Sequence, residues 1–340
     1  MSWKTILSEA EPVDGRNGVS YYAVDTQRVL NRVSSPRLPF DLSLNPYLNC
    51  ELGCAYCYAR DFSHKRQGGE GSFDREICAK RGAAEVLRRE LQRLRRTERL
   101  GTPIALGTAT DPYQPAERRS RVTRELLEVM AEFGGVSVAI TTKSDLVLRD
   151  LDVLSDLARR GRVRVNMSVT TPDRDLARTL EPRAQTPRKR LAAVERLARA
   201  GILTGVFCMP ILPNITDGSR DLRTLVYEST VEGASYFATR VLELRAGVRP
   251  AFFAWLQRER PALVARYRRR YARGANGPRD EAERIERLVS FLRRQYGIPA
   301  FVPFEAPPPC QNAQLELFGG DPAPQDPPRP TRRLPTVEAA

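Results

Sequence analysis

The sequence predicts an α/β fold in which six short strands alternate with helices. Short apolar runs recur through the middle of the chain, and amphipathic helical patterns separate them. Two of the helical patterns also end at a glycine that suits a helix C-terminus, Gly161 and Gly201. Strands that alternate with helices form right-handed βαβ units and a parallel sheet. Six such units are too few to close an eight-stranded barrel.

The elements follow one another in a regular order. The predicted strands are residues 42–45, 103–107, 136–140, 163–167, 203–207 and 236–241. The predicted helices between them are residues 83–95, 123–133, 150–160, 187–200 and 221–232. Each strand is therefore expected to lead into a loop at the same edge of the sheet.

The chain divides into four predicted parts. Residues 1–40 form a lead-in that packs on the barrel, with a turn signal at Arg16-Asn17-Gly18. Residues 41–245 form the core, and residues 246–300 form a basic helical extension whose aromatic side chains pack on the barrel. Residues 301–340 are rich in proline and are expected to be a largely disordered tail.

Charge favours a polyanionic partner such as nucleic acid. The chain has 55 basic and 41 acidic residues, a net charge of +14. An arginine-rich coding bias is an alternative explanation, so charge alone does not establish a nucleic-acid partner. The single histidine, His64, excludes a multi-histidine metal site and makes a Ser-His-Asp triad hard to sustain.

Composition also predicts the compartment. The chain is 41% hydrophobic, and no apolar run is long enough to span a bilayer, so we expect no membrane partner. The first residues lack the pattern of a signal peptide. Six cysteines in 340 residues do not make a disulfide framework. We therefore expect a cytoplasmic protein.

Three of the cysteines lie in one short loop, Cys50-x3-Cys54-x2-Cys57. Three thiolates can hold three irons of a [4Fe–4S] cluster and leave the fourth iron open to a small molecule. A zinc site normally uses four ligands, and the ferredoxin run uses two-residue gaps with a fourth cysteine. The spacing favours an open cluster over both of these alternatives.

The loop resembles the CxxxCxΦC motif of the radical S-adenosylmethionine (SAM) superfamily, with Tyr56 in the aromatic position. The resemblance implies a partial (β/α)6 TIM-like barrel. It also implies that the open iron chelates the amino and carboxylate groups of SAM, and that reductive cleavage yields a 5′-deoxyadenosyl radical. An electron donor such as a ferredoxin or flavodoxin would supply the electron.

Several strand ends carry polar residues, as expected where function collects in parallel α/β barrels. The strings 45–47, 105–115, 142–144, 168–170 and 180–183 are, as a set, similar to the spore photoproduct lyase family and its bacterial relatives. This resemblance implies that Thr110 and Asp111 contact the SAM amino group or the surroundings of the cluster. It implies that Lys143 and Ser168 hold the SAM carboxylate and that the backbone near Tyr56 reads adenine.

Two further residues are candidates with clear alternatives. Arg183 is a candidate for the SAM carboxylate or a substrate phosphate, although it could instead pair with a carboxylate such as Glu181. Cys208 ends the fifth predicted strand and is a candidate hydrogen-atom donor, although a small buried thiol is the commoner fate of such a residue. Lys143 could equally be a solvated loop lysine, and Asp111-Pro112 could simply turn the chain.

The leading hypothesis is a radical SAM enzyme with a lyase-like or other radical reaction, for which nucleic acid is the favoured substrate. A nucleic-acid-binding module with a structural metal site is the alternative from another class. An electron-transfer protein is a third hypothesis and would need no SAM site.

Overall fold

The structure is a computed structural model, and it describes residues 3–35, 38–67 and 73–303. The predicted Pro-rich tail lies outside these residues, apart from residues 301–303. Within the described ranges, no helix is both long enough and apolar enough to cross a membrane.

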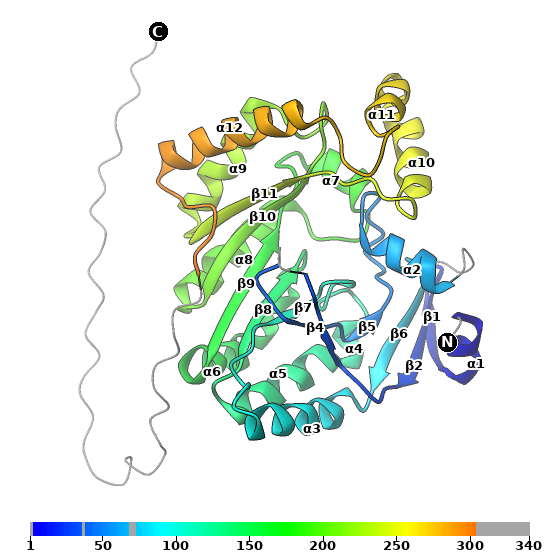
Figure 1. The fold of residues 1–340 in the computed structure, drawn as a ribbon, viewed down its shortest axis with the longest axis vertical. Helices are drawn as coiled ribbons and strands as arrows, with labels where there is room; N and C mark the ends of the chain where they lie inside the picture. The colour runs from blue at the N-terminus through cyan, green and yellow to red at the C-terminus, as the bar shows by residue number, and fades with distance from the viewer. Residues whose placement is uncertain (1–2, 36–37, 68–72, 304–340) are drawn as a thin grey trace. The chain divides into compact units, whose positions relative to one another are not determined.

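Six parallel strands form most of a seven-stranded sheet (Figure 1). They are β4 (Leu42–Leu44), β7 (Ile104–Leu106), β8 (Ser137–Thr142), β9 (Arg162–Ser168), β10 (Leu203–Ile211) and β11 (Tyr236–Val241). They lie side by side in chain order, and β3 (Leu30–Arg32) pairs antiparallel with β4. All six predicted strands are confirmed. The sheet is open, with β3 and β11 at its edges, as a partial barrel requires.

The helices between these strands also match the prediction. They are α3 (Ala83–Arg96), α5 (Val122–Phe133), α6 (Leu151–Arg160), α8 (Pro187–Arg199) and α9 (Ser219–Val231). Each buries an apolar stripe against the outward side of the strands, and together these stripes form the larger hydrophobic core. The loops add α4 (Glu117–Ser120), a 3₁₀ turn η1 (Asp145–Asp150) and α7 (Arg174–Leu180), which were not predicted.

A second sheet was not predicted. After α1 (Trp3–Glu9), strands β1 (Glu11–Arg16) and β2 (Val19–Asp25) form a hairpin, and β2 pairs with β6 (Glu76–Arg81), which pairs with β5 (Tyr47–Leu48). The predicted turn at Asn17-Gly18 closes the hairpin, since both residues have positive φ. Every residue of β1 is exposed, so the hairpin lacks the apolar alternation that identifies a strand.

The C-terminal extension is helical, as predicted. It comprises α10 (Arg249–Glu259), a 3₁₀ turn η2 (Pro261–Leu263), α11 (Val264–Arg270) and α12 (Arg279–Tyr296). Four aromatic side chains of α10, α11 and the turn after it are buried, and they join a second hydrophobic core that includes the cysteine loop and α7: Phe252, Trp255, Tyr267 and Tyr271. The predicted packing of these aromatic residues is therefore confirmed, and it places the extension beside the cysteine loop.

Candidate active site at the carboxyl end of the sheet

The cysteine loop begins where the two sheets meet. Strand β4 belongs to the large sheet and β5 to the small one, and the loop runs from β5 into α2 (Ala59–Gln67). Cys50 and Cys54 are buried, and Cys57 is half-buried. Gly53 has a φ of +68°, and a Cβ there would lie 3.2 Å from the Asp74 carboxylate. The turn before Cys54 therefore requires glycine.

Hydrogen bonds from several segments hold this loop in place. The Cys50 amide donates to the Phe73 carbonyl (3.1 Å), and the Ala55 amide donates to the Leu180 carbonyl (2.9 Å). Arg60 donates to the Cys54 carbonyl (3.1 Å), and Arg183 donates to the Glu51 carbonyl (2.8 Å). The loop is thus fixed by its own helix α2, by the residues before β6 and by the region after α7.

The three thiols lie close enough to influence one another. Burial, followed by Asp111 and the other two thiols, raises the pKa of Cys50 well above its usual value. Burial also raises the pKa of Cys54, to about 12, while Lys143 opposes the rise. In the described residues, no three His, Cys, Asp or Glu side chains converge on one ion position. The thiolates of a cubane each bind a different iron, so three thiols in one loop fit a [4Fe–4S] cluster that keeps one iron open.

Thr110 and Asp111 hold the cysteine loop from the neighbouring strand. The Thr110 hydroxyl donates to the Asn49 carbonyl (2.6 Å), and the Asp111 amide donates to the Cys50 sulfur (3.4 Å). The Asp111 carboxylate accepts from the Thr142 hydroxyl and from the Lys143 amide, both at 2.7 Å. Both residues therefore lie in the surroundings of the cysteines, which is one of the two positions that the resemblance implied.

A buried network connects the cysteine loop to the ends of β9 and α7. Its centre is the Glu181 carboxylate, which accepts from the hydroxyls of Tyr56 and Thr170 and pairs with the Arg190 guanidinium. Burial would raise the pKa of Glu181, but Arg190 and then Lys143 outweigh it and hold that pKa below its usual value. Glu181 therefore stays ionised and holds the Tyr56 hydroxyl.

Lys143 and Ser168 follow neighbouring strands. The Lys143 ammonium lies 5.8 Å from the centre of the Tyr56 ring. Burial opposes its charge, but Cys54 and Glu181 outweigh burial and raise its pKa, so the ammonium is retained. Ser168 is buried at the end of β9, where its carbonyl accepts from Arg190 (3.0 Å). The structure brings both residues to the same end of the sheet as the cysteines.

Sequence reasoning missed the role of Glu181 and missed Arg190 altogether. Arg190 is 1% exposed, and it lies on the buried side of α8 with Leu191, Val194 and Leu197. An arginine on the apolar stripe of an amphipathic helix was a readable signal, because such a charge is rarely buried unless it is paired.

Arg183 and Cys208, the two further candidates, lie outside the Glu181–Arg190 ion pair. Arg183 does not pair with Glu181, whose carboxylate is taken by Arg190; it instead holds the Glu51 carbonyl and lies 3.8 Å from Asp74. Cys208 is fully buried in the larger core, and its thiol donates to the Thr170 carbonyl (3.9 Å). Burial raises the pKa of this thiol to about 12. Its placement is that of a small core residue.

Tyr58 is a further site residue that the sequence did not single out. It follows Cys57 directly, and its hydroxyl donates to the Thr108 carbonyl in the loop after β7. Its ring remains 47% exposed and contacts the Phe62 ring edge-on, with the ring centres 6.1 Å apart. An aromatic side chain thus lies at the rim of the candidate active site, beside Cys57.

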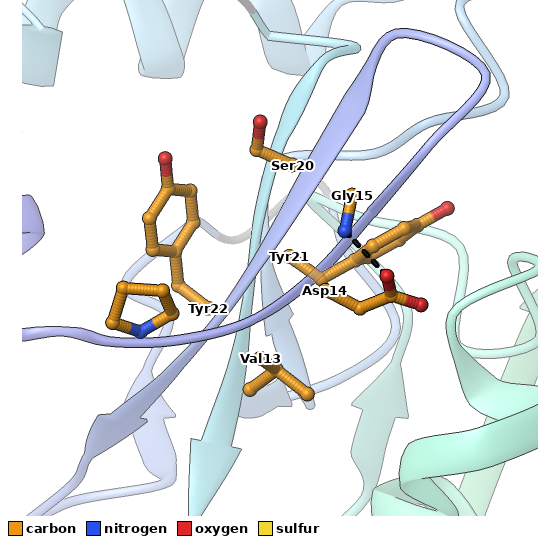
Figure 2. Close-up of a pocket in the computed structure, with 7 residues that line it drawn as sticks. Val13, Asp14, Gly15, Ser20, Tyr21 and Tyr22 are labelled. Carbon is orange, nitrogen blue, oxygen red and sulfur yellow. Dashed lines mark hydrogen bonds between the residues drawn. The ribbon is translucent and has the colours of Figure 1, made fainter.

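The hairpin of β1 and β2 contacts the cysteine loop. Tyr21 interacts with the Glu51 carboxylate, and burial followed by Glu51 raises the pKa of Tyr21 to about 12. Figure 2 shows Tyr21 and Tyr22 on opposite sides of β2, next to a cavity of about 360 Å³ on the hairpin. A second cavity, of about 570 Å³, lies between the end of β11 and the start of α12. Neither cavity is lined by a cysteine, so neither is the candidate active site.

Sequence comparison identifies similar proteins. The family model described as "Radical SAM superfamily" matches residues 44–226. The uncharacterised protein Rv2578c of Mycobacterium tuberculosis is 34% identical over 282 residues, which cover 82% of this chain and 82% of that protein. The uncharacterised protein MJ0683 of Methanocaldococcus jannaschii is 29% identical over 174 residues, which cover 51% of this chain and 61% of that protein.

Structure comparison gives the same fold. A spore photoproduct lyase complexed with dinucleoside spore photoproduct has a TM-score of 0.62 and 16% identity, and the match covers 81% of this chain and 79% of that chain. A mutant of spore photoproduct lyase with bound AdoMet and the same dinucleoside has a TM-score of 0.60 at 16% identity, with the same coverage. At this level of identity the likeness establishes the fold, and the site must be judged on its own residues.

Proposed function

The chain belongs to the radical SAM superfamily, and from this we propose that Cys50, Cys54 and Cys57 bind a [4Fe–4S] cluster whose open iron binds SAM. The observation that carries the proposal is that three loop thiols lie at the same end of a parallel sheet as Lys143, Ser168 and the Glu181 network. When bound and reduced, the cluster would supply the one electron that cleaves SAM to methionine and a 5′-deoxyadenosyl radical.

The residues of this chain have separate tasks in the proposal. Lys143 keeps its charge and would bind the SAM carboxylate, and the buried Ser168 lies at the adjoining strand end. Asp111 and Thr110 hold the loop that carries Cys50. Glu181 and Arg190 fix Tyr56, so that the backbone beside it can meet adenine. The second core, formed by α7, α10 and α11, excludes water from the buried side of the loop.

We further propose DNA as the substrate and a one-electron carrier, such as a ferredoxin or flavodoxin, as a partner in the cytoplasm. The net charge of +14 supports a polyanionic substrate. The fold is that of a lyase whose structure carries a dinucleoside spore photoproduct, which supports the nucleotide class. Arg183 holds a loop carbonyl and lies near Asp74, so we do not assign it a substrate phosphate.

Anaerobic reconstitution tests the cofactor proposal. The protein should bind about four irons per chain and, with SAM and dithionite, release 5′-deoxyadenosine. Cys54→Ala should lose the cluster and the product. Cys208→Ala removes a buried thiol outside the loop and serves as the matched control, which should keep both. Zinc in place of iron, or full 5′-deoxyadenosine formation by Cys54→Ala, would show that the proposal is wrong.

A second assay tests the substrate. Reconstituted protein is incubated with SAM, reductant and ultraviolet-irradiated DNA, and the DNA is digested and analysed for repaired bases. Repair that depends on SAM supports a lyase-like reaction on DNA. SAM cleavage that leaves the bases unchanged, at a rate unaffected by DNA, would contradict the substrate and leave the cofactor chemistry standing.

A further inference from the structure

An arginine-rich surface lies on α11 and the turn that follows it, and the site described above does not use it. Four exposed arginines form this surface: Arg266, Arg268, Arg269 and Arg273. Among the residues that the structure describes, none of the four is paired with a carboxylate, whereas their neighbour Arg270 pairs with Glu281. Four adjacent cations without counter-charges repel one another, and a bound polyanion relieves that repulsion.

Two buried tyrosines hold this surface rigidly. Tyr267 and Tyr271 are fully buried and stacked, with ring centres 5.9 Å apart. Their hydroxyls donate to the Pro213 carbonyl (2.6 Å) and the Leu242 carbonyl (3.1 Å). Because these tyrosines face inward, Arg266 and Arg269, three residues apart on α11, share its outward side, and the exposed Arg273 follows in the turn after the helix. The charges are therefore presented on a fixed support.

The helical extension that carries this surface is hydrogen-bonded to α2, beside the candidate active site. Beside it, the Leu244 amide donates to the Ala275 carbonyl (2.7 Å), and the Gly247 amide donates to the Asp61 carboxylate of α2 (3.0 Å). Figure 1 shows α10 next to α2 and α11 beyond α10. A chain that contacts both α11 and Tyr58 would therefore pass along α10.

Two exposed aromatic rings lie at the rim of the candidate active site. Tyr58 is 47% exposed and Phe62 is 46% exposed, and they contact each other edge-on. Such a pair contributes little to either hydrophobic core and offers open faces to a flat ligand. Basic tracks that end in exposed aromatic rings are typical of surfaces that bind unpaired nucleotides, because the rings stack on the bases.

We propose that this surface binds a single strand of DNA, with its phosphodiester backbone on Arg266, Arg269 and Arg273 and a base on the Tyr58–Phe62 pair. The inference rests on the proposed function, since it names where the substrate of that site docks. A single strand fits because the face of a base reaches an aromatic ring only when the base is unpaired and unstacked.

A matched pair of triple variants tests the arginines. Arg266→Ala/Arg269→Ala/Arg273→Ala is compared with Arg89→Ala/Arg93→Ala/Arg96→Ala, which removes three exposed arginines from α3 and changes the net charge equally. Binding of a fluorescent single-stranded 15-mer is followed by anisotropy of the reconstituted protein between 50 and 200 mM NaCl. The α11 triple should raise the Kd about tenfold and lower the log–log salt slope by about 2, at about 0.7 per lost contact. The α3 triple should change the Kd less than twofold.

A second matched pair tests the aromatic end. Phe62→Ala should weaken binding about five- to tenfold without changing the salt slope, because stacking releases no counterions. Phe291→Ala, which truncates a 53% exposed phenylalanine on α12, should leave the Kd unchanged. Equal effects of the two phenylalanine variants would overturn the stacking site.

The remaining outcomes separate this docking surface from the proposed function. Wild-type protein that fails to cleave SAM would overturn the proposed function. Wild-type protein that cleaves SAM while both arginine triples bind DNA equally would overturn only the docking surface. Tighter binding of duplex DNA or single-stranded RNA of the same sequence would overturn the assignment to single-stranded DNA.

Discussion

Two arginines are buried at opposite ends of β9, and their surroundings differ. At the carboxyl end, Arg190 is 1% exposed and meets the Glu181 carboxylate, the Ser168 carbonyl and the Gln185 carbonyl. Towards the amino end, Arg164 is 2% exposed and lies over two aromatic rings, 4.6 Å from the centre of Phe301 and 5.6 Å from that of Tyr236.

The pKa values of the two guanidiniums shift in opposite directions. Burial disfavours both charges, but Glu181 outweighs burial at Arg190 and raises its pKa. At Arg164 burial dominates the interaction with Tyr236, and the pKa is lowered. A buried ion pair seldom adds net stability, so its presence points to a positioning role. We infer that the ion pair at the carboxyl end of β9 has a positioning role. At the amino end, aromatic rings cover the arginine.

Breaking the ion pair at the carboxyl end should have the largest effect. Glu181→Ala leaves Arg190 charged and buried without its carboxylate, which should lower the free energy of unfolding by about 3–5 kcal/mol. Urea unfolding monitored by circular dichroism measures this. Glu195→Ala on α8, which breaks a surface pair with Arg199, is the control and should cost no more than about 0.5 kcal/mol.

The double variant Glu181→Ala/Arg190→Met separates stability from positioning. Removing both charges should recover most of the lost stability, while SAM cleavage stays impaired because Tyr56 has lost its partner. Full recovery of both properties would contradict the positioning role of the pair.

Removing the positive charge beside Tyr56 should affect SAM binding more than stability. Lys143→Met keeps the length of the side chain but loses a charge-assisted hydrogen bond worth about 1.5–3 kcal/mol, so the Kd for SAM should rise about ten- to a hundredfold. Equilibrium dialysis with labelled SAM measures it. Lys189→Met, which alters an exposed lysine on α8, should bind SAM normally. Equal affinities in the two variants would exclude Lys143 from the SAM site.

Replacing the arginine at the amino end should have a smaller effect on stability and none on chemistry. Arg164→Met keeps an unbranched side chain between the rings and removes a cation–π contact of about 0.5–2 kcal/mol. Thermal unfolding and 5′-deoxyadenosine formation are measured together. If Arg164→Met slowed SAM cleavage as much as Arg190→Met does, the two ends would not differ in the way proposed.

The smallest effect is a change in acid sensitivity. The folded protein holds the pKa of Glu181 below its usual value of 4.5, so its ionised form is favoured. This contribution to stability is complete above pH 4.5 and is lost as pH falls through the lower folded value. The apoprotein of Glu181→Gln should therefore lose stability less steeply than wild type between pH 5 and 3. Parallel curves would indicate that Glu181 has an ordinary pKa.

The sequence predicts local periodicity well and long-range pairing poorly. The six parallel strands and their helices are regular apolar runs, and the cysteine loop is a compact motif, so all of these are readable in one dimension. The small sheet is not readable in this way: β5 has two residues, β1 is fully exposed, and β6 joins them from beyond the cysteine loop. The turn at Asn17-Gly18 is the one part of the small sheet that the sequence predicted.

The candidate site shows the same division. Positions of Lys143 and Ser168 after their strands could be predicted because parallel strands end at one edge. The partners of Glu181 could not, because Tyr56 lies 125 residues away and Arg190 lies on a different helix. Asp111 was identified, but its bonds to Thr142 and Lys143 depend on how two loops pack together.

The most direct test is electron paramagnetic resonance of the reduced, reconstituted protein with and without SAM. SAM bound to an open iron alters the electronic structure of the cluster, so we predict a [4Fe–4S] signal whose g values shift when SAM is added. Lys143→Met should need more SAM for the same shift. A cluster signal that saturating SAM leaves unchanged, or a protein that assembles no cluster on Cys50, Cys54 and Cys57, would contradict the proposed site.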